Sequence, residues 1–237
     1  MYNENGYFIA PIPNIVPLLE ELRAEIYEVF NIVSLSSGGN EIKNDFDVIN
    51  FRNTNQPKQH QAVKHLWGSA KLFSIAGHDV FAEILDSLGF VRPVLELPPL
   101  LRCDMPIKEQ IIFEKHQDYA YNIGSDNSVT VWIPLQNTDE STGALLVAPG
   151  THLKGVYPNK QGIITDEFQF EFKSCPVNFG EALIFNQKLV HQSGVNTSKQ
   201  IRFSVQLRFS DLGCSQYAQR GYPINHKLTT ESYFKEI

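Results

Sequence analysis

Alternating apolar and polar side chains mark the strand patterns in the second half of the chain. In residues 201–209 the two kinds of side chain fall on opposite faces of one strand. The apolar face holds Ile201, Phe203, Val205, Leu207 and Phe209, and the polar face holds Arg202, Ser204, Gln206 and Arg208. Shorter strands are expected at 110–115, 128–134, 182–185 and 189–190. One face of the 201–209 strand therefore packs in a core, whereas the other lines solvent or a cavity.

The first part of the chain shows helical spacing instead. From Pro17 to Ile32 the apolar residues form one stripe, made of Leu18, Leu22, Ile26, Val29 and Phe30. Residues 61–88 repeat this spacing with breaks near Gly68 and Gly77, which predicts two or three helices. Residues 34–59 are rich in Gly and Asn, a composition typical of a mobile cover. The whole pattern predicts a mainly β protein with flanking helices.

Length, charge and cysteine usage narrow the class of protein. The chain has 237 residues, of which 42% are hydrophobic, and we expect one domain over 1–237, with a helical part at about 1–92, a β-rich core at about 93–211 and a tail at 212–237. A net charge of −6 argues against a nucleic-acid partner. The N-terminus does not resemble a signal peptide and no apolar run is long enough to cross a membrane, so we expect a cytoplasmic protein without a membrane partner. The three scattered cysteines fit reduced thiols, and oligomeric state stays open.

A His-x-Asp pair is the strongest chemical signal. On an extended segment, His116 and Asp118 point to the same side while Gln117 turns away, so the pair can chelate one metal ion. His191, far along the chain, can complete a set of two histidines and one carboxylate, which leaves open positions and suits non-haem Fe(II). A structural zinc site would need four closed ligands, and no Cys-x-x-Cys is present.

The polar face of the 201–209 strand offers a place for an acid. Arg202 has a planar fork that can hold a carboxylate through two hydrogen bonds, and the Ser204 hydroxyl points the same way. Shielded from water, such a charge-assisted contact contributes about 1.5–3 kcal/mol. The two residues are therefore a compact receptor for the far end of a dicarboxylate.

From about Leu100 to Ser210 the chain resembles the phytanoyl-CoA dioxygenase-like branch of the Fe(II)- and 2-oxoglutarate-dependent oxygenases. The matching segments are EKHQDYAY, SVTVWIPL, DESTGALLVAPGTHLKG, FGEALIFNQKLVHQSGVNTS and IRFSVQLRF. The resemblance implies a double-stranded β-helix (jelly-roll, cupin-like) core, with His116, Asp118 and His191 as iron ligands. It also implies that Arg202 and Ser204 hold the distal carboxylate of 2-oxoglutarate.

Further assignments follow from the same resemblance. Thr130 and Trp132 are expected to form another wall of the co-substrate pocket. Related halogenases replace the carboxylate ligand by a small residue, and this chain keeps Asp118, which favours hydroxylation. In the Pro-Gly-Thr-His segment, His152 is expected to fix a loop rather than to bind iron.

The expected activity is that of a dioxygenase that uses Fe(II), 2-oxoglutarate and O2. It would hydroxylate a C–H bond of a small metabolite or biosynthetic intermediate and release succinate and CO2. Four residues near the ligands are candidates for substrate contact: Tyr119, Tyr121, Asn122 and Gln187.

Two other functions remain open at this point. A cupin-like metalloenzyme of another reaction class would keep the metal ligands but would not need Arg202 and Ser204 in one pocket. A non-catalytic barrel that binds a ligand would merely bury its histidines, and Asp118→Ala would leave its affinity for Fe(II) unchanged.

Overall fold

The computed structural model describes residues 2–106, 111–121 and 124–222. Its main sheet is antiparallel, has five strands and runs in the order β1-β8-β3-β10-β2. The bounds of these strands are β1 Tyr7–Pro11, β8 Glu181–Asn186, β3 Ser128–Pro134, β10 Arg202–Asp211 and β2 Pro93–Asp104. A second sheet runs β7-β4-β9, with bounds Lys173–Cys175, Leu145–Val147 and His191–Gln192, and β5 (Asn159–Lys160) pairs with β6 (Ile163–Ile164).

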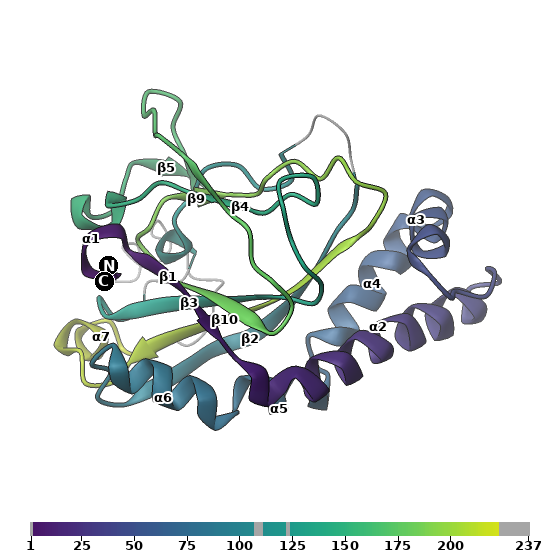
Figure 1. Ribbon diagram of the computed structural model, residues 1–237, viewed down its shortest axis with the longest axis horizontal. Helices are drawn as coiled ribbons and strands as arrows, with labels where there is room; N and C mark the ends of the chain where they lie inside the picture. Colours follow the sequence, from purple (N-terminus) through teal and green to yellow (C-terminus); the bar gives the residue numbers. More distant parts are fainter. Residues whose placement is uncertain (1, 107–110, 122–123, 223–237) are drawn as a thin grey trace.

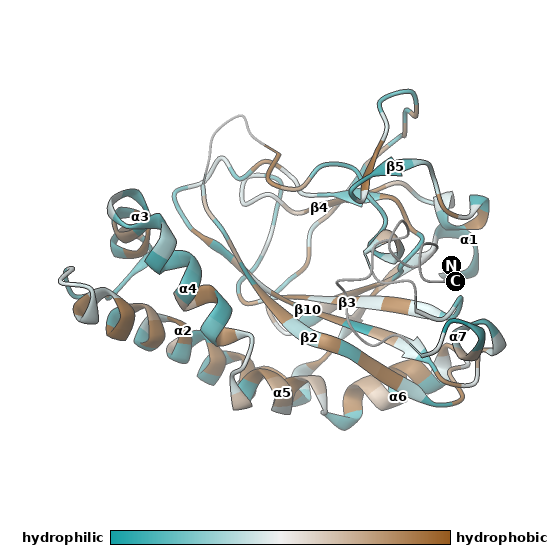
Figure 2. Ribbon diagram, turned by 180° about the vertical axis from the view of Figure 1, so that it is seen from behind, coloured by the Kyte–Doolittle hydropathy of each residue, from teal (hydrophilic) through white to brown (hydrophobic). Residues whose placement is uncertain are grey.

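Figure 1 shows α2, α5 and α6 below the five-stranded sheet and β4 and β9 of the second sheet above it. The α-helices are α1 Tyr2–Asn5, α2 Val16–Ser36, α3 Asp45–Thr54, α4 Gln56–Leu66, α5 Ala70–Ala76, α6 Asp79–Ser87 and α7 Ser215–Gln219. Three short 3-10 helices are η1 Pro13–Ile15, η2 Asp118–Ala120 and η3 Thr151–Lys154. Buried apolar residues of α2, α4, α5 and α6 belong to the same core cluster as those of β3 and β10. Figure 2 shows hydrophobic residues recurring along these helices and along the strands of the sheet. The main core therefore lies between helices and sheet, away from the polar face of β10.

β10 behaves as its alternation predicts. It pairs with β2 on one side and with β3 on the other. Its apolar side chains join the helix-covered core: Ile201, Phe203, Val205, Leu207 and Phe209. Arg202, Ser204, Gln206 and Arg208 are buried as well, on the other face. Buried polar residues along a whole strand face need partners or a ligand, because stripping them of water is costly.

The helical predictions are confirmed in most places and wrong in one. Residues 61–88 contain the end of α4 and all of α5 and α6, with the breaks at Gly68 and Gly77. Residues 34–59 are not an irregular cover, because α2 extends to Ser36 and α3 and α4 occupy most of the remainder. Asn44 and Asn55 cap α3 and α4 through their side chains, and Val48 and Phe51 of α3 are buried. The asparagines that made the segment look irregular are therefore the starts of helices.

Two predicted strands are absent from the described residues, and one observed strand was not predicted. The described part of 110–115 is irregular, and His116 makes only isolated bridges. Residues 189–190 lie in the turn before β9. β1 lies within the part expected to be helical and pairs with β8 at the edge of the main sheet. Its short apolar run carried too little alternation to be recognised.

Two simpler expectations can also be compared with the structure. All three cysteines are free thiols. Within the described residues, the longest and most apolar helices are still too short or too polar to span a bilayer.

Candidate active site

Three potential metal ligands meet between the two sheets. His116 and His191 exchange both backbone hydrogen bonds, with N to O distances of 2.9 Å and 3.0 Å. β9 in turn pairs with β4, where Val147 lies opposite His191. Asp118 begins η2 one extended residue after His116, and Gln117 points away to the backbone of Gly155. One ligand atom from each of His116, Asp118 and His191 lies within 4.8 Å of the others, and all three residues are buried.

Backbone carbonyls fix which nitrogen of each imidazole faces the centre. His116 Nδ1 lies 2.7 Å from the Glu114 carbonyl oxygen, and His191 Nδ1 lies 3.0 Å from that of Leu189. A carbonyl only accepts, so each Nδ1 carries the proton and each Nε2 keeps its lone pair. The two Nε2 atoms lie 3.7 Å and 4.0 Å from Asp118 Oδ1. The donor set is thus oriented inward as a metal requires.

Two neighbours hold the carboxylate ligand. Thr130 donates to Asp118 Oδ2 at 2.6 Å, and Arg208 Nη2 donates to Asp118 Oδ1 at 2.8 Å. Burial raises the pKa of Asp118, but Arg208 and the two imidazoles outweigh it and keep this pKa well below its ordinary value. Burial also lowers the pKa of His191 to about 3, with His116 adding to the effect and Asp118 opposing it. At neutral pH the site therefore offers a carboxylate and a neutral His191, both in ligating form.

A cavity of about 220 Å³ opens beside the two histidines. Its lining includes Trp132, Arg202 and Tyr121. Arg202 is 2% exposed, and its Nε and Nη1 have no hydrogen-bond partner. The buried Ser204 hydroxyl also lacks a partner. Because buried donors without partners are rare and costly, these atoms indicate a missing acceptor.

Asp104 is a feature that the sequence reading missed. It lies directly opposite Arg202 in the pairing of β2 with β10, and Arg202 Nη2 donates to its Oδ2 at 2.6 Å. Arg102 donates to the same carboxylate from the other side, with Nη2 3.0 Å from Oδ1. Burial raises the pKa of Asp104, but Arg102 and Arg202 reverse this and lower it to about 2. Asp104 thus accepts from Nη2 of Arg202, and Nε and Nη1 of the same guanidinium group stay without a partner.

The other predicted site residues fall in different places. Trp132 lines the cavity, with the Arg202 guanidinium carbon 5.8 Å from its ring centroid. Thr130 binds the Asp118 carboxylate and is not among the residues that line the cavity. His152 lies outside the ligand group, with Nε2 3.3 Å from the carbonyl oxygen of Asn3, which agrees with a loop-fixing role.

Of the four candidates for substrate contact, Tyr121 lines the cavity. Gln187 lies outside the lining and donates to Glu96 at 3.1 Å. Asn122 lies outside the described residues.

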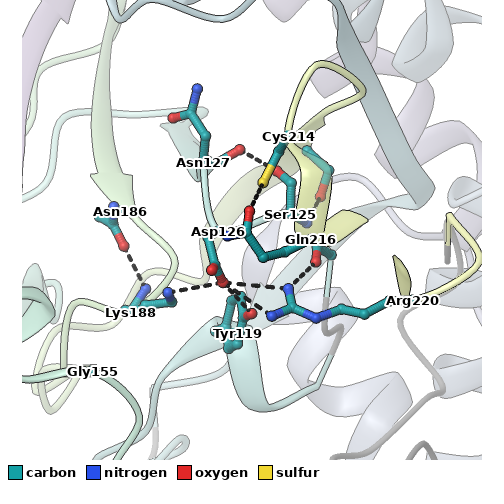
Figure 3. Close-up of polar contacts among 12 residues, drawn as sticks. Tyr119, Ser125, Asp126, Asn127, Gly155, Asn186, Lys188, Cys214, Gln216 and Arg220 are labelled. Atoms are coloured by element: carbon teal, nitrogen blue, oxygen red, sulfur yellow. Dashed lines mark hydrogen bonds and ion pairs between the residues drawn. The ribbon is translucent and has the colours of Figure 1, made fainter. Parts of the chain in front are cut away.

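Tyr119 belongs to a separate polar cluster on the far side of η2. Its hydroxyl donates to Asp126 Oδ1 at 2.7 Å, and Lys188 and Arg220 converge on the same carboxylate (Figure 3). Lys188 lies three residues before His191, and Arg220 directly follows α7. The cluster therefore links η2, which contains Asp118, to the segment before His191 and to the end of α7. None of its four residues lines the cavity.

Comparison with known proteins extends these observations. The family model "Phytanoyl-CoA dioxygenase (PhyH)" matches residues 2–204. A peroxisomal phytanoyl-CoA dioxygenase of Bos taurus is 30% identical over 114 residues, which are 42% of this chain and 34% of the relative. A phytanoyl-CoA dioxygenase of Arabidopsis thaliana is 24% identical over 163 residues, 65% of this chain and 57% of the relative. The matched part of this chain thus spans about a third to just over half of these curated relatives.

Solved structures share the fold at low sequence identity. The epimerase SnoN from nogalamycin biosynthesis, solved with Fe3+, alpha ketoglutarate and nogalamycin RO, superposes with a TM-score of 0.62 at 16% identity, over 89% of this chain and 80% of SnoN. EvdO2 from Micromonospora carbonacea var. aurantiaca, complexed with 2-oxoglutarate, gives 0.57 at 18% identity, over 90% of each chain. The match over residues 2–204 covers most of the sequence and includes both segments that carry the ligand triad. The chain therefore belongs to the phytanoyl-CoA dioxygenase (PhyH) family.

Proposed function

We propose that this protein is an Fe(II)- and 2-oxoglutarate-dependent dioxygenase that hydroxylates a C–H bond of a small metabolite or biosynthetic intermediate and releases succinate and CO2. The observation that carries the proposal is the combination of two features at one cavity. The His116, Asp118 and His191 ligand atoms converge beside it, and Arg202 of β10, whose Nε and Nη1 have no partner, lines it. Ser204, two residues further along the same strand face, also has an unpartnered hydroxyl but is not among the residues that line the cavity.

The donor set fits Fe(II). Two imidazole nitrogens and one carboxylate form a facial triad, which leaves the remaining coordination positions for small ligands. Outer hydrogen bonds to Glu114, Leu189 and Thr130 orient all three ligands, as is usual for metal sites in proteins. His116, Asp118 and His191 would hold the metal.

The cavity fits 2-oxoglutarate. The free edge of the Arg202 guanidinium and the Ser204 hydroxyl are donors for the distal carboxylate. Trp132 gives this end of the cavity a flat wall, and Asp104 prevents the Arg202 side chain from rotating away. The residues thus supply a cation, a hydroxyl and a rigid wall for one end of a dicarboxylate.

Each residue contributes position rather than bond-breaking chemistry. Fe(II) with 2-oxoglutarate and O2 supplies the oxidising power to hydroxylate an unactivated C–H bond. Arg202 and Ser204 orient the co-substrate, and Thr130 and Arg208 fix the carboxylate ligand. Buried walls around the triad exclude water, which protects the site from side reactions.

The fold assignment belongs to the same proposal. We assign the five-stranded sheet and the β7-β4-β9 sheet to the two halves of a double-stranded β-helix, with the triad between them. β1 extends the five-stranded sheet at its edge, and the helices α2 to α6 pack against that sheet, which supports one domain over 1–237.

The test is succinate formation from 2-oxoglutarate under air, with Fe(II) and ascorbate. We expect slow, Fe(II)-dependent turnover even without the true substrate, and its loss in His191→Ala. Arg202→Ala should raise the KM for 2-oxoglutarate by about tenfold or more, because a charge-assisted contact is removed. Fe(II) binding without a response to 2-oxoglutarate would favour a cupin-like enzyme of another class, and Asp118→Ala without loss of Fe(II) affinity would favour a ligand-binding barrel.

A further inference from the structure

Three arginines line the cavity beside the metal-ligand triad. Arg102 comes from β2, and Arg202 and Arg208 come from the polar face of β10. None of the described residues that line the cavity is acidic. A cavity with several guanidinium groups and no carboxylate in its wall favours anionic contents.

The co-substrate accounts for only one of these arginines. In the function proposed above, Arg202 holds the distal carboxylate of 2-oxoglutarate. Arg102 and Arg208 remain without an assigned partner inside the cavity. Each forms an ion pair with a carboxylate that does not line the cavity. Arg102 binds Asp104, and Arg208 binds Asp118.

Arg208 has a buried donor without a partner among the described residues. It is 8% exposed, its Nη2 donates to Asp118 at 2.8 Å and to Gln206 Oε1 at 3.4 Å, and its Nε has no partner. A buried guanidinium with a free N–H beside a cavity is costly unless an acceptor arrives.

Arg102 stands nearby with a different exposure. Its side chain is 23% exposed, and its guanidinium carbon lies 5.0 Å from the centroid of the Phe113 ring. Nε and Nη2 donate to Asp104, at 3.4 Å and 3.0 Å, so Nη1 is not used in this ion pair. Arg102 lines both this cavity and a neighbouring one. The stacking and the ion pair hold the group in one orientation, so little side-chain entropy is lost when it binds a ligand.

We propose that Arg102 and Arg208 bind a carboxylate group of the substrate, so that the enzyme acts on a small organic acid. The proposal rests on the function proposed above. The volume of about 220 Å³ is below the roughly 300–1,000 Å³ of typical ligand pockets, which fits a small molecule beside the co-substrate. Apolar walls from Trp67, Leu100 and Phe113 suit its carbon skeleton. Because Arg208 contacts Asp118, an acid held there presents its neighbouring carbons to the triad.

The chain contains a built-in reporter for this test. It has two tryptophans, and both Trp67 and Trp132 line the cavity. Protein loaded with redox-inert Zn(II) and 2-oxoglutarate is titrated with small carboxylic acids and amino acids, while tryptophan fluorescence is recorded. Each acid is paired with its primary amide, and phosphate monoesters form a separate set.

We expect at least one acid to give a saturable change, and its amide to bind about tenfold or more weakly. Arg102→Gln and Arg208→Lys should each weaken binding of that acid more than they weaken binding of 2-oxoglutarate. Arg52→Gln is the matched control, because Arg52 lines a neighbouring cavity and not this one. It should leave the affinity for the acid unchanged.

The outcomes separate the two proposals. If 2-oxoglutarate itself gives no response in the Zn(II)-loaded protein, the proposed function fails and this inference fails with it. If 2-oxoglutarate binds but no acid does, the carboxylate assignment alone is overturned. Equal binding of amides, a response to phosphate monoesters only, or unchanged acid binding in both arginine variants also overturns it.

Discussion

The carboxylate of Asp118 depends on two side chains that do not themselves face a metal. Thr130 and Arg208 each occupy one of its oxygens, at 2.6 Å and 2.8 Å. Partners of this kind set the direction of a ligand, and their loss commonly reduces metal affinity by about 10- to 100-fold. At the residue scale, the geometry of the candidate metal site therefore depends on Thr130 and Arg208 as well as on the three ligands.

Thr130→Val tests that dependence. It removes the hydroxyl and keeps the shape, so we expect the affinity for Fe(II) to fall by about tenfold or more while the fold is retained. Anaerobic titration with Fe(II) measures the change. Thr138→Val is the control, since the Thr138 hydroxyl is also buried and hydrogen-bonded, to Val177. Equal metal affinity in both variants would contradict the role given to Thr130.

Asp104→Asn tests the support of the co-substrate arginine. The amide keeps the size but loses the charge that holds Arg202, so the affinity for 2-oxoglutarate should fall by about tenfold while Fe(II) affinity changes little. Titration of 2-oxoglutarate into metal-loaded protein measures this. A loss of Fe(II) affinity as large as the loss of 2-oxoglutarate affinity would indicate a general structural defect instead.

The same carboxyl group gives a dependence of stability on pH. Its pKa is about 2 in the folded protein and 3.8 ordinarily, so folding favours the ionised form. The resulting stabilisation is complete above about pH 4 and is lost as the pH falls through about 2. It amounts to about 2 kcal/mol, and Asp104→Asn should flatten the fall of the unfolding free energy between pH 4 and 2 by about that much. An unchanged slope in acid denaturation would contradict the lowered pKa.

At the scale of elements, the sequence predicts the faces and spacings within one segment. It does not predict the side-chain contacts that arise when two strands pair. The alternation in 201–209 predicts β10 and both of its faces, and His116 with Asp118 is found because one extended residue separates them. Asp104 reaches Arg202 only through the pairing of β2 with β10, and nothing in the segment around Asp104 indicates that partner. Likewise, the alternation places Arg208 on the polar face of the strand but does not indicate that Asp118 lies beside it.

The misread segment 34–59 follows from the same limit. Asn44 and Asn55 are turn-formers by composition, but in the structure they accept from Asp47 N and Lys58 N and start helices. Their effect depends on the buried residues that follow, such as Val48.

Asn44→Ala tests the helix-starting role. It removes the cap of α3, so the free energy of unfolding should fall by about 1 kcal/mol. Asn50→Ala, at an exposed position within the same helix, should be neutral or slightly stabilising. Denaturant unfolding of both variants measures the difference. Equal stability of the two variants would show that the cap contributes nothing.

At the scale of the whole molecule, packing and chemistry are separated by the five-stranded sheet. The helices that lie below the five-stranded sheet in Figure 1 form the main core with its apolar face. Arg202, Gln206 and Arg208, from the polar face of β10, line the cavity together with two of the triad residues. The polar cluster around Asp126 links Arg220, which follows α7, to Tyr119 and Lys188 (Figure 3). This separation lets a stable scaffold hold buried, unpartnered donors at the cavity, which are costly until a ligand binds.

The most direct test of the central claim is an anaerobic spectrum of the protein with Fe(II) and 2-oxoglutarate. Chelation of Fe(II) by the 2-oxo acid gives a visible metal-to-ligand charge-transfer band. We expect this band in the parent, its loss in His191→Ala, and a need for about tenfold or more 2-oxoglutarate in Arg202→Ala. A folded, metal-loaded parent without the band would contradict the assignment of this cavity to Fe(II) and 2-oxoglutarate.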